Sequence, residues 1–266
     1  MRIDAIDMGM KIAGAIVRPL VYVTLCLPAA IVVVTSFTAG ESLRFPPEGF
    51  SLRWYQAAIT SEPFMNALWS STRLAFIATV LSLTIGLASS FAIDRFRFRG
   101  REAFRTLTLS PLVVPMVVLG LALLQFLSWM QLNQTFTGLL IGHVLITLPY
   151  VVRTLTASFV LFDRTLEQAA MNLRAPPWRV LRRITLPLIG PALVSASVFS
   201  FVTSFGNITL SVFLGFAGET TLPVQIFTYV EHGYDPILAA VSTIVILVTL
   251  IVIAIVEKLV GMETVA

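Results

Sequence analysis

Charged side chains are scarce in this chain. Asp, Glu, Lys and Arg make up 12% of its 266 residues, about half of the roughly 25% that soluble proteins carry. Because a bilayer-spanning helix needs about 20 apolar residues, the lengths of the uncharged stretches predict an all-α polytopic membrane protein. They exclude a soluble enzyme and a disordered tail, and they lack the alternation of a membrane β-barrel. The uncharged stretches are residues 19–40, 74–93, 106–152, 184–218 and 236–256.

Residues that catalysis commonly uses are also rare. The single cysteine, Cys26, cannot form an internal disulfide and lies in the first apolar run, where a packing role is expected. Neither lysine, Lys11 or Lys258, stands in a Gly-x-x-x-x-Gly-Lys-Ser/Thr motif, so this chain is not expected to hydrolyse ATP itself. The sequence contains no His and Cys cluster typical of a metal site. We therefore expect no catalytic residue, no metal and no cofactor bound by this chain.

The uncharged stretches divide into six expected transmembrane helices. A polar segment at 131–138 splits the longest stretch in two, and Pro111 and Pro115 are expected to kink the first of these halves. A cleaved signal peptide is the alternative for the first span, but acidic Asp4 and Asp7 in the preceding segment favour an uncleaved helix. The expected spans are 18–38, 71–93, 106–130, 138–160, 188–212 and 237–256.

Basic residues are unevenly divided between the two sides that six spans define. With the N-terminus inside, 15 of the 18 Lys and Arg residues fall on that side, and only Arg44, Arg53 and Arg73 fall on the other. Because Lys and Arg are retained in cytoplasmic loops, both termini are predicted to be cytoplasmic. The basic and aromatic run at 95–101 could suggest nucleic-acid binding in isolation, but its place between two spans makes it a topology signal.

One cytoplasmic segment, residues 163–187, mixes apolar and charged residues in an unusual way. Pro176–Pro177 ends its first predicted helix before a short basic one. An apolar stripe ringed by charge is typical of a docking element for a cytosolic partner, and a solvated connector on the membrane surface is the alternative. The residues of the stripe share one helical face by their i, i+3, i+4, i+7 spacing: Leu166, Ala169, Ala170 and Leu173.

A few uncharged polar residues lie within the predicted spans. His143 is near the middle of the fourth, where an ionisable group suggests function. A neutral imidazole bonded to a neighbouring helix is the plainer interpretation. Asn207 beside Gly206, with Thr203 and Ser204 nearby, could line a solute pathway or stabilise helix packing. The sequence leaves both interpretations open.

The 163–187 segment resembles the EAA loop in permease subunits of bacterial ATP-binding-cassette importers of the type I, MetI-like fold. The family pattern is Glu-Ala-Ala, three residues, Gly, nine residues and Ile-x-Leu-Pro. Here Gln168-Ala169-Ala170, Arg174 and Ile184-Thr-Leu186-Pro187 keep that spacing. Further segments resemble the spermidine/putrescine branch: Leu166-Glu167, Ala175-x-Pro177-Trp178, Phe50-Ser-Leu-Arg-Trp-Tyr55, Arg95-Phe-Arg-Phe-Arg-Gly100, Thr221-Leu-Pro-Val224 and Tyr234-Asp-Pro236.

The resemblance implies a single permease domain over residues 1–266 in the bacterial inner membrane, moving a small polar solute by alternating access. It implies a periplasmic solute-binding protein, a second permease subunit of a different sequence, and two cytosolic ATPases that bind ATP and Mg. Membrane lipid is the remaining partner, and no nucleic acid is expected. The residues implied in ATPase coupling are Glu167, Gln168, Ala169, Ala170, Arg174, Ala175, Pro177 and Trp178.

Two residues depart from the family pattern. Gln168 replaces the loop glutamate, for which the adjacent Glu167 is a candidate substitute. Arg174 replaces a turn glycine, and an arginine disfavours a backbone conformation with φ > 0. Span five has Ser204-Phe205-Gly206-Asn207 where the branch often has acidic residues, so the solute is expected to be polyamine-like or a related amino or zwitterionic compound. An ATP-independent carrier or channel is the alternative function, and a membrane scaffold for a soluble enzyme is a weaker one.

Overall fold

The computed structural model of the chain describes residues 2–216, 218–233 and 235–261. For residues 2–14, 16, 232, 252, 255–257 and 259–261 it describes the backbone alone. Within the described residues every regular element is helical, apart from one isolated bridge between Phe216 and Glu219, so the all-α prediction is confirmed. The chain forms two compact units, one of residues 1–62 and 228–252 and one of residues 63–227 and 253–266.

The first unit contains α1 (Arg2–Thr35), α2 (Arg53–Thr60) and most of α13 (Ile237–Gly261). The side chains of α1 from Val17 to Ile31 are exposed, as expected for a helix with apolar surroundings in the cell. The loop between α1 and α2 is ordered by hydrogen bonds. The hydroxyls of Ser36 and Tyr55 lie 2.6 Å apart, and Arg53 and Trp54 both donate to the carbonyl of Gly40.

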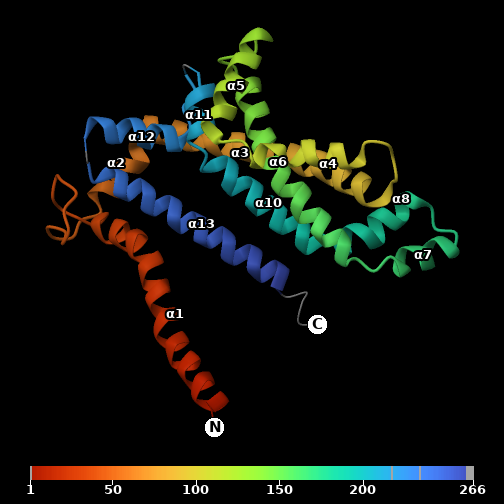
Figure 1. The fold of residues 1–266 in the computed structure, drawn as a ribbon. Coiled ribbons are helices and arrows are strands. Elements are labelled where there is room, and N and C mark those ends of the chain that lie inside the picture. The colour runs from red at the N-terminus through yellow and green to blue at the C-terminus, as the bar shows by residue number, and fades with distance from the viewer. Residues whose placement is uncertain (1, 217, 234, 262–266) are drawn as a thin grey trace. The chain divides into compact units, whose positions relative to one another are not determined.

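The second unit holds the other helices, and Figure 1 labels most of them. Two of its helices, α3 and α12, extend by a few residues into the sequence of the first unit. The helices are α3 (Glu62–Arg95), α4 (Arg101–Leu109), η1 (Ser110–Leu112), α5 (Met116–Trp129), α6 (Phe136–Leu161), α7 (Thr165–Asn172), α8 (Pro177–Val180), η2 (Leu181–Thr185), α9 (Leu186–Leu188), α10 (Gly190–Phe205), α11 (Thr209–Leu214) and α12 (Leu222–His232).

Two predicted spans are interrupted: the third is bent where Pro111 and Pro115 were expected to kink it, and the fifth has a break that was not expected. In the third span, the segment Arg101–Leu112 and the helix α5 are bent by 107° relative to each other. Pro115 stands at the break, where it has no backbone N–H for a helical hydrogen bond. In the fifth, α10 ends before Gly206 and α11 begins at Thr209. The segment from Pro177 to Leu188 also meets α10 at 69°.

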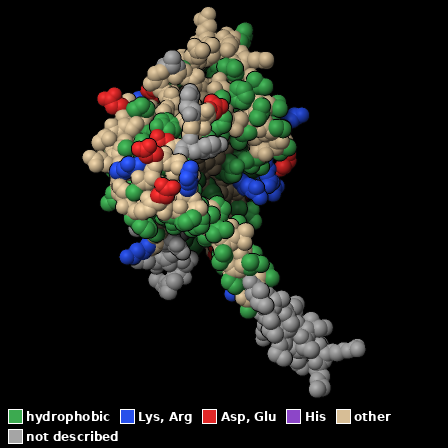
Figure 2. All heavy atoms as spheres, turned by 90° about the vertical axis from the view of Figure 1, so that its left-hand side faces the viewer, with side chains coloured by type: hydrophobic (Ala, Val, Ile, Leu, Met, Phe, Trp, Pro, Cys, Tyr) green, Lys and Arg blue, Asp and Glu red, His purple; other side chains and the backbone are tan. Residues whose placement is uncertain are grey.

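Among the residues that the structure describes, three helices are long and apolar enough to cross a membrane: Val17–Thr35, Glu62–Arg95 and Phe136–Leu161. The count rises to five if each bent pair is one span, and Ile237–Ile251 is a shorter apolar helix. The number six therefore stays a prediction. Hydrophobic side chains lie at the surface over much of the face in Figure 2, as a lipid-embedded protein requires.

Small residues allow α3 and α6 to approach closely. Ser82 and Thr147 have their hydroxyls 2.6 Å apart, and Ser90 donates to the carbonyl of Val152 at 3.3 Å. Between these bridges, a Cβ on Gly86 would lie 2.5 Å from Cγ1 of Val151. Contacts of small residues and hydroxyls are typical of helix packing in membranes, and this pair positions the end of α3 beside the segment described next.

Candidate functional site

The segment 163–187 folds as two short helices, as predicted. Asp163 caps α7 by accepting a hydrogen bond from the backbone N–H of Thr165 at 2.9 Å. That bond holds the pKa of the Asp163 carboxyl below its ordinary value. Pro176 and Pro177 separate α7 from α8, and a five-residue π-helical turn, η2, continues α8 toward α9. π-helical turns occur frequently at functional sites.

Arg174 adopts the backbone conformation that its side chain disfavours. Its φ is +62°, in the left-handed region that favours glycine. Its N–H donates to the carbonyl of Met171, and the N–H of Ala175 donates to that of Ala170. This pair of bonds is a Schellman motif. Two backbone hydrogen bonds therefore hold this turn despite a cost of roughly 1–2 kcal/mol for a non-glycine residue in the left-handed conformation.

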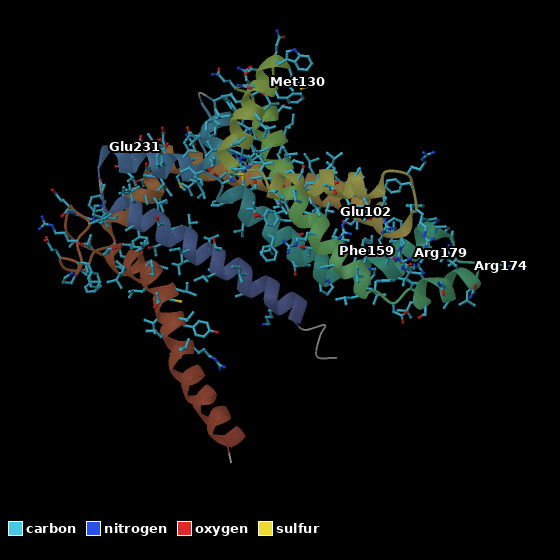
Figure 3. The ribbon with its side chains drawn as sticks, viewed as in Figure 1. Glu102, Met130, Phe159, Arg174, Arg179 and Glu231 are labelled. Carbon is cyan, nitrogen blue, oxygen red and sulfur yellow. The ribbon has the colours of Figure 1, made fainter. Side chains whose placement is uncertain are left out.

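The apolar stripe of α7 points outward. Leu166 is 48% exposed and Leu173 84%, and Trp178 on α8 adds a ring that is 60% exposed. Gln168 and Ala169 are exposed, while Ala170, Ala175 and Pro176 are half-buried. Figure 3 labels Arg174 and Arg179 on the same segment. The structure thus presents apolar side chains with basic neighbours, as a docking element requires.

Glu167 differs from its neighbours because it points inward. It is 8% exposed, and one carboxylate oxygen lies 2.8 Å from Nη2 of Arg95. The hydroxyl of Thr185 on η2 donates to the other oxygen. Glu167 therefore joins α7 to the last residue of α3 and to η2 within this chain.

Two further ion pairs, both made by Asp94, extend this connection. Asp94 lies 3.1 Å from Nη1 of Arg95 and 2.8 Å from Nη2 of Arg164. Three phenylalanine rings surround the guanidinium of Arg95, with centroids 5.3–5.7 Å from its carbon: Phe91, Phe159 and Phe162. Aromatic faces attract a cation within about 6 Å. We call Asp94, Arg95, Arg164, Glu167 and Thr185 the α3–α7 clamp.

Sequence reasoning did not identify Arg95 as part of this site. It was counted among the cytoplasmic arginines, and its partner Glu167 is 72 residues away. The available signal was weak: Asp94 and Arg95 are the first charges after an apolar run, directly before the Arg-Phe repeats. Long-range pairing of this kind has no local sequence pattern.

The polar residues predicted in the spans are only partly brought together. His143 is fully buried, and its ring nitrogens lie 2.8 Å from the hydroxyl of Ser204 and 3.2 Å from that of Ser211. His143 thereby links α6 to both α10 and α11. Ser211, which the sequence interpretation missed, lies one turn beyond Asn207 and donates to its carbonyl.

Asn207 and Thr203 take other positions. The side-chain oxygen of Asn207 accepts from the backbone N–H of Leu210 at 2.9 Å, so it caps the start of α11 at the break after α10. Both Asn207 and Thr203 are half-buried. Among the described residues no group of three or more His, Cys, Asp or Glu side chains could hold a metal ion.

Comparison with known proteins identifies relatives that are permease proteins of transport systems. Residues 82–261 match the family described as "Binding-protein-dependent transport system inner membrane component". The chain is 32% identical to the spermidine/putrescine permease PotC of Haemophilus influenzae, over 86% of this chain and 89% of that protein. It is 30% identical to the putrescine permease PotI of Escherichia coli, over 82% and 80%. Identity to the putative 2-aminoethylphosphonate permease PhnV of Salmonella paratyphi A is 27%, over 94% and 95%.

Solved structures share the fold. A chain of the bacterial alginate ABC transporter, solved with its alginate-bound periplasmic protein, superposes with a TM-score of 0.73 at 15% identity, covering 99% of this chain and 98% of that one. The MetNI methionine transporter gives 0.62 at 18%, covering 76% and 98%. The predicted MetI-like fold is confirmed. The chain belongs to the family of binding-protein-dependent transport system inner membrane components, the membrane permeases of ABC importers.

Proposed function

We propose that this permease imports a small amine-bearing polar solute, polyamine-like or a related amino or zwitterionic compound. The relatives support this class, because spermidine, putrescine and 2-aminoethylphosphonate, named in their descriptions, all carry a primary amine on a short chain. In this proposal a periplasmic protein delivers the solute and a second permease of different sequence completes the pathway. Two cytosolic ATPases bind ATP and Mg, and both termini of this chain are cytoplasmic.

The observation that carries the proposal is the apolar stripe of α7 and α8, whose side chains are exposed. The α3–α7 clamp holds this segment in place from its buried side. Leu173 and Trp178 are exposed at 84% and 60%, which soluble surfaces rarely combine in one patch unless a partner covers it. We assign this surface to ATPase docking. Glu167 acts in docking by positioning α7, since its carboxylate is bound to Arg95 and Thr185.

The clamp connects the docked segment to the helices that form the pathway. α7 is held to α3 through Arg95, and η2 and α9 lead directly into α10. When the ATPases close, displacement of α7–α8 moves the cytoplasmic end of α3 and the start of α10 with it. This transmission supplies alternating access without ATP hydrolysis in this chain.

Replacing Trp178 by alanine tests the docking surface. We expect co-purification of the ATPase with the permease to fall about tenfold or more, because a buried interface tryptophan often contributes about 2 kcal/mol or more. Trp129→Ala is the matched control, since Trp129 ends α5 and is 80% exposed. Undiminished ATPase association in the Trp178 variant would assign the stripe to another role.

Asn207 tests the pathway. Asn207→Ala removes the cap on α11 and is expected to cost about 1 kcal/mol of stability. Asn207→Asp keeps an oxygen acceptor for Leu210 and places a negative charge at the break between α10 and α11. We expect the aspartate variant to keep its melting temperature and to lower KM for an amine-bearing solute severalfold. Unchanged uptake by the aspartate variant would leave Asn207 with capping alone.

A further inference from the structure

The turn between α3 and α4 and the first two turns of α4 carry arginines without partners. We call residues 96–107 the α3–α4 corner. The side chains of Arg97, Arg99 and Arg105 are exposed and make no ion pair or hydrogen bond with any residue the structure describes. Nε of Arg101 is buried and has no hydrogen-bond partner among the described residues. By contrast, Arg73, Arg95 and Arg164 each pair with a carboxylate.

Apolar side chains alternate with these arginines. Phe96 is 58% exposed, Phe98 41%, and Leu107 70%. The rings of Phe98 and Phe104 meet edge to face with centroids 6.2 Å apart. The corner therefore exposes cationic and large apolar groups together. Glu102, labelled on α4 in Figure 3, is the single acidic residue in it.

The corner is an ordered turn. Gly100 has φ +85°, with open space where a side chain would stand, and this conformation costs glycine little. The N–H of Arg101 donates to the carbonyl of Phe98, and that of Phe104 to the carbonyl of Gly100. The arginines therefore extend from a turn whose backbone shape is fixed, so less ordering is needed when they bind.

Its place in the chain puts the corner at a membrane boundary. Arg105 is the last charged residue before the uncharged stretch 106–152, and Leu107 is highly exposed just beyond it. On the other side, Asp94 and Arg95 are joined to α7. In the topology of the proposed function this boundary faces the cytoplasmic leaflet. A surface that exposes arginines and large apolar side chains together matches the boundary between lipid headgroups and acyl chains.

We propose that the α3–α4 corner binds the phosphate of an anionic phospholipid such as phosphatidylglycerol. Guanidinium groups bind phosphate oxygens in a bidentate geometry, and Arg97, Arg99 and Arg105 are free to do so. Phe96, Phe98 and Leu107 contact the upper acyl chains. Each basic residue near an anionic surface contributes about fivefold in affinity, so the three exposed arginines account for roughly a hundredfold.

The test uses the full chain, purified in neutral detergent without its ATPase, and titrated with fluorescent phosphatidylglycerol. The variant Arg97→Gln/Arg99→Gln/Arg105→Gln is expected to bind at least tenfold more weakly, with unchanged size-exclusion behaviour. The control Arg179→Gln/Arg182→Gln/Arg183→Gln removes the same charge from exposed residues of the α8–η2 segment, and it is expected to lose less than threefold. A lysine triple variant of the corner keeps the charge but not the bidentate geometry. It serves as a folding control and is expected to bind more tightly than the glutamine variant and more weakly than the unmodified protein.

Three results would overturn the proposal. The first is equal loss in the two glutamine triple variants, which indicates non-specific attraction. The second is displacement of the lipid by millimolar inorganic phosphate, which assigns the arginines to a free anion. The third is undiminished lipid binding by the corner variant. This result also counts against the proposal if, in a separate co-purification experiment, the same variant loses its ATPase. Because the ATPase is absent from the titration, a negative result would contradict the lipid site without bearing on the proposed importer function.

Discussion

Replacing Glu167 by alanine is expected to detach α7 from α3 while the rest of the protein stays folded. The carboxylate of Glu167 and the guanidinium of Arg95 are 11% and 12% exposed, so removing Glu167 leaves a buried guanidinium whose remaining carboxylate partner is Asp94. Removing one partner of a buried ion pair costs about 3–5 kcal/mol, and the lower figure applies here because Asp94 stays in place. At the lower figure, the amides of 165–172 exchange roughly a hundredfold faster in hydrogen exchange, since about 1.4 kcal/mol is tenfold in an equilibrium constant. Solute uptake is also expected to fall, because α7 is then no longer held to α3.

Two controls separate positioning from direct ATPase contact. Gln168→Ala changes the adjacent, exposed residue and is expected to leave exchange in α7 unchanged. In Glu167→Leu/Arg95→Met both charges are replaced by apolar groups of similar size, so the double variant is expected to be less destabilised than the two single variants added together. Wild-type exchange in Glu167→Ala, combined with lost ATPase binding, would show that Glu167 contacts the ATPase directly.

Enlarging Gly86 is expected to cause a large loss of stability. A Cβ there would lie 2.5 Å from Cγ1 and 2.9 Å from Cβ of Val151, a fully buried β-branched residue whose side chain has little freedom. Gly86→Ala is expected to cost about 1–3 kcal/mol. Gly86→Leu cannot be accommodated without separating α3 from α6, and we expect it to abolish accumulation in the membrane.

The matched control is Gly190→Ala at the start of α10. A Cβ on Gly190 meets nothing within 4 Å, so this change is expected to be neutral or slightly stabilising. Thermal unfolding in detergent and the yield of membrane-inserted protein measure both variants. A Gly86→Leu variant with the melting temperature of the unmodified protein would contradict the close approach of α3 and α6.

Hydropathy and charge predicted the helical class and much of its layout. The expected spans 71–93 and 138–160 fall within α3 and α6. The bend in 106–130 was expected from Pro111 and Pro115. The break within 188–212 was not expected, because an apolar run has no periodicity that distinguishes a straight helix from a bent one. Proline alone does not decide this, since Pro149 lies inside α6 while Pro115 stands at a break.

The sequence indicated the exposed face of the 163–187 segment but not the buried contacts of Glu167. The helical spacing of Leu166 and Leu173 correctly indicated an outward face, because that spacing is local. The inward position of Glu167 depends on Arg95 and Thr185, which are 72 and 18 residues away. Arg174 shows the reverse case: the residue disfavours φ > 0, but hydrogen bonds from its neighbours' backbone impose that conformation.

The clamp also has a consequence for biosynthesis. Asp94 and Arg95 leave the ribosome 70–72 residues before Arg164 and Glu167, which is on the order of 4–14 seconds at about 5–20 residues per second. During that interval the two charged residues that end α3 have only each other as partners, and their charges hold the end of α3 at the membrane surface. Emergence of α7 then completes the pairs, so the nascent chain can join α3 to α7 only after α6 between them has been made.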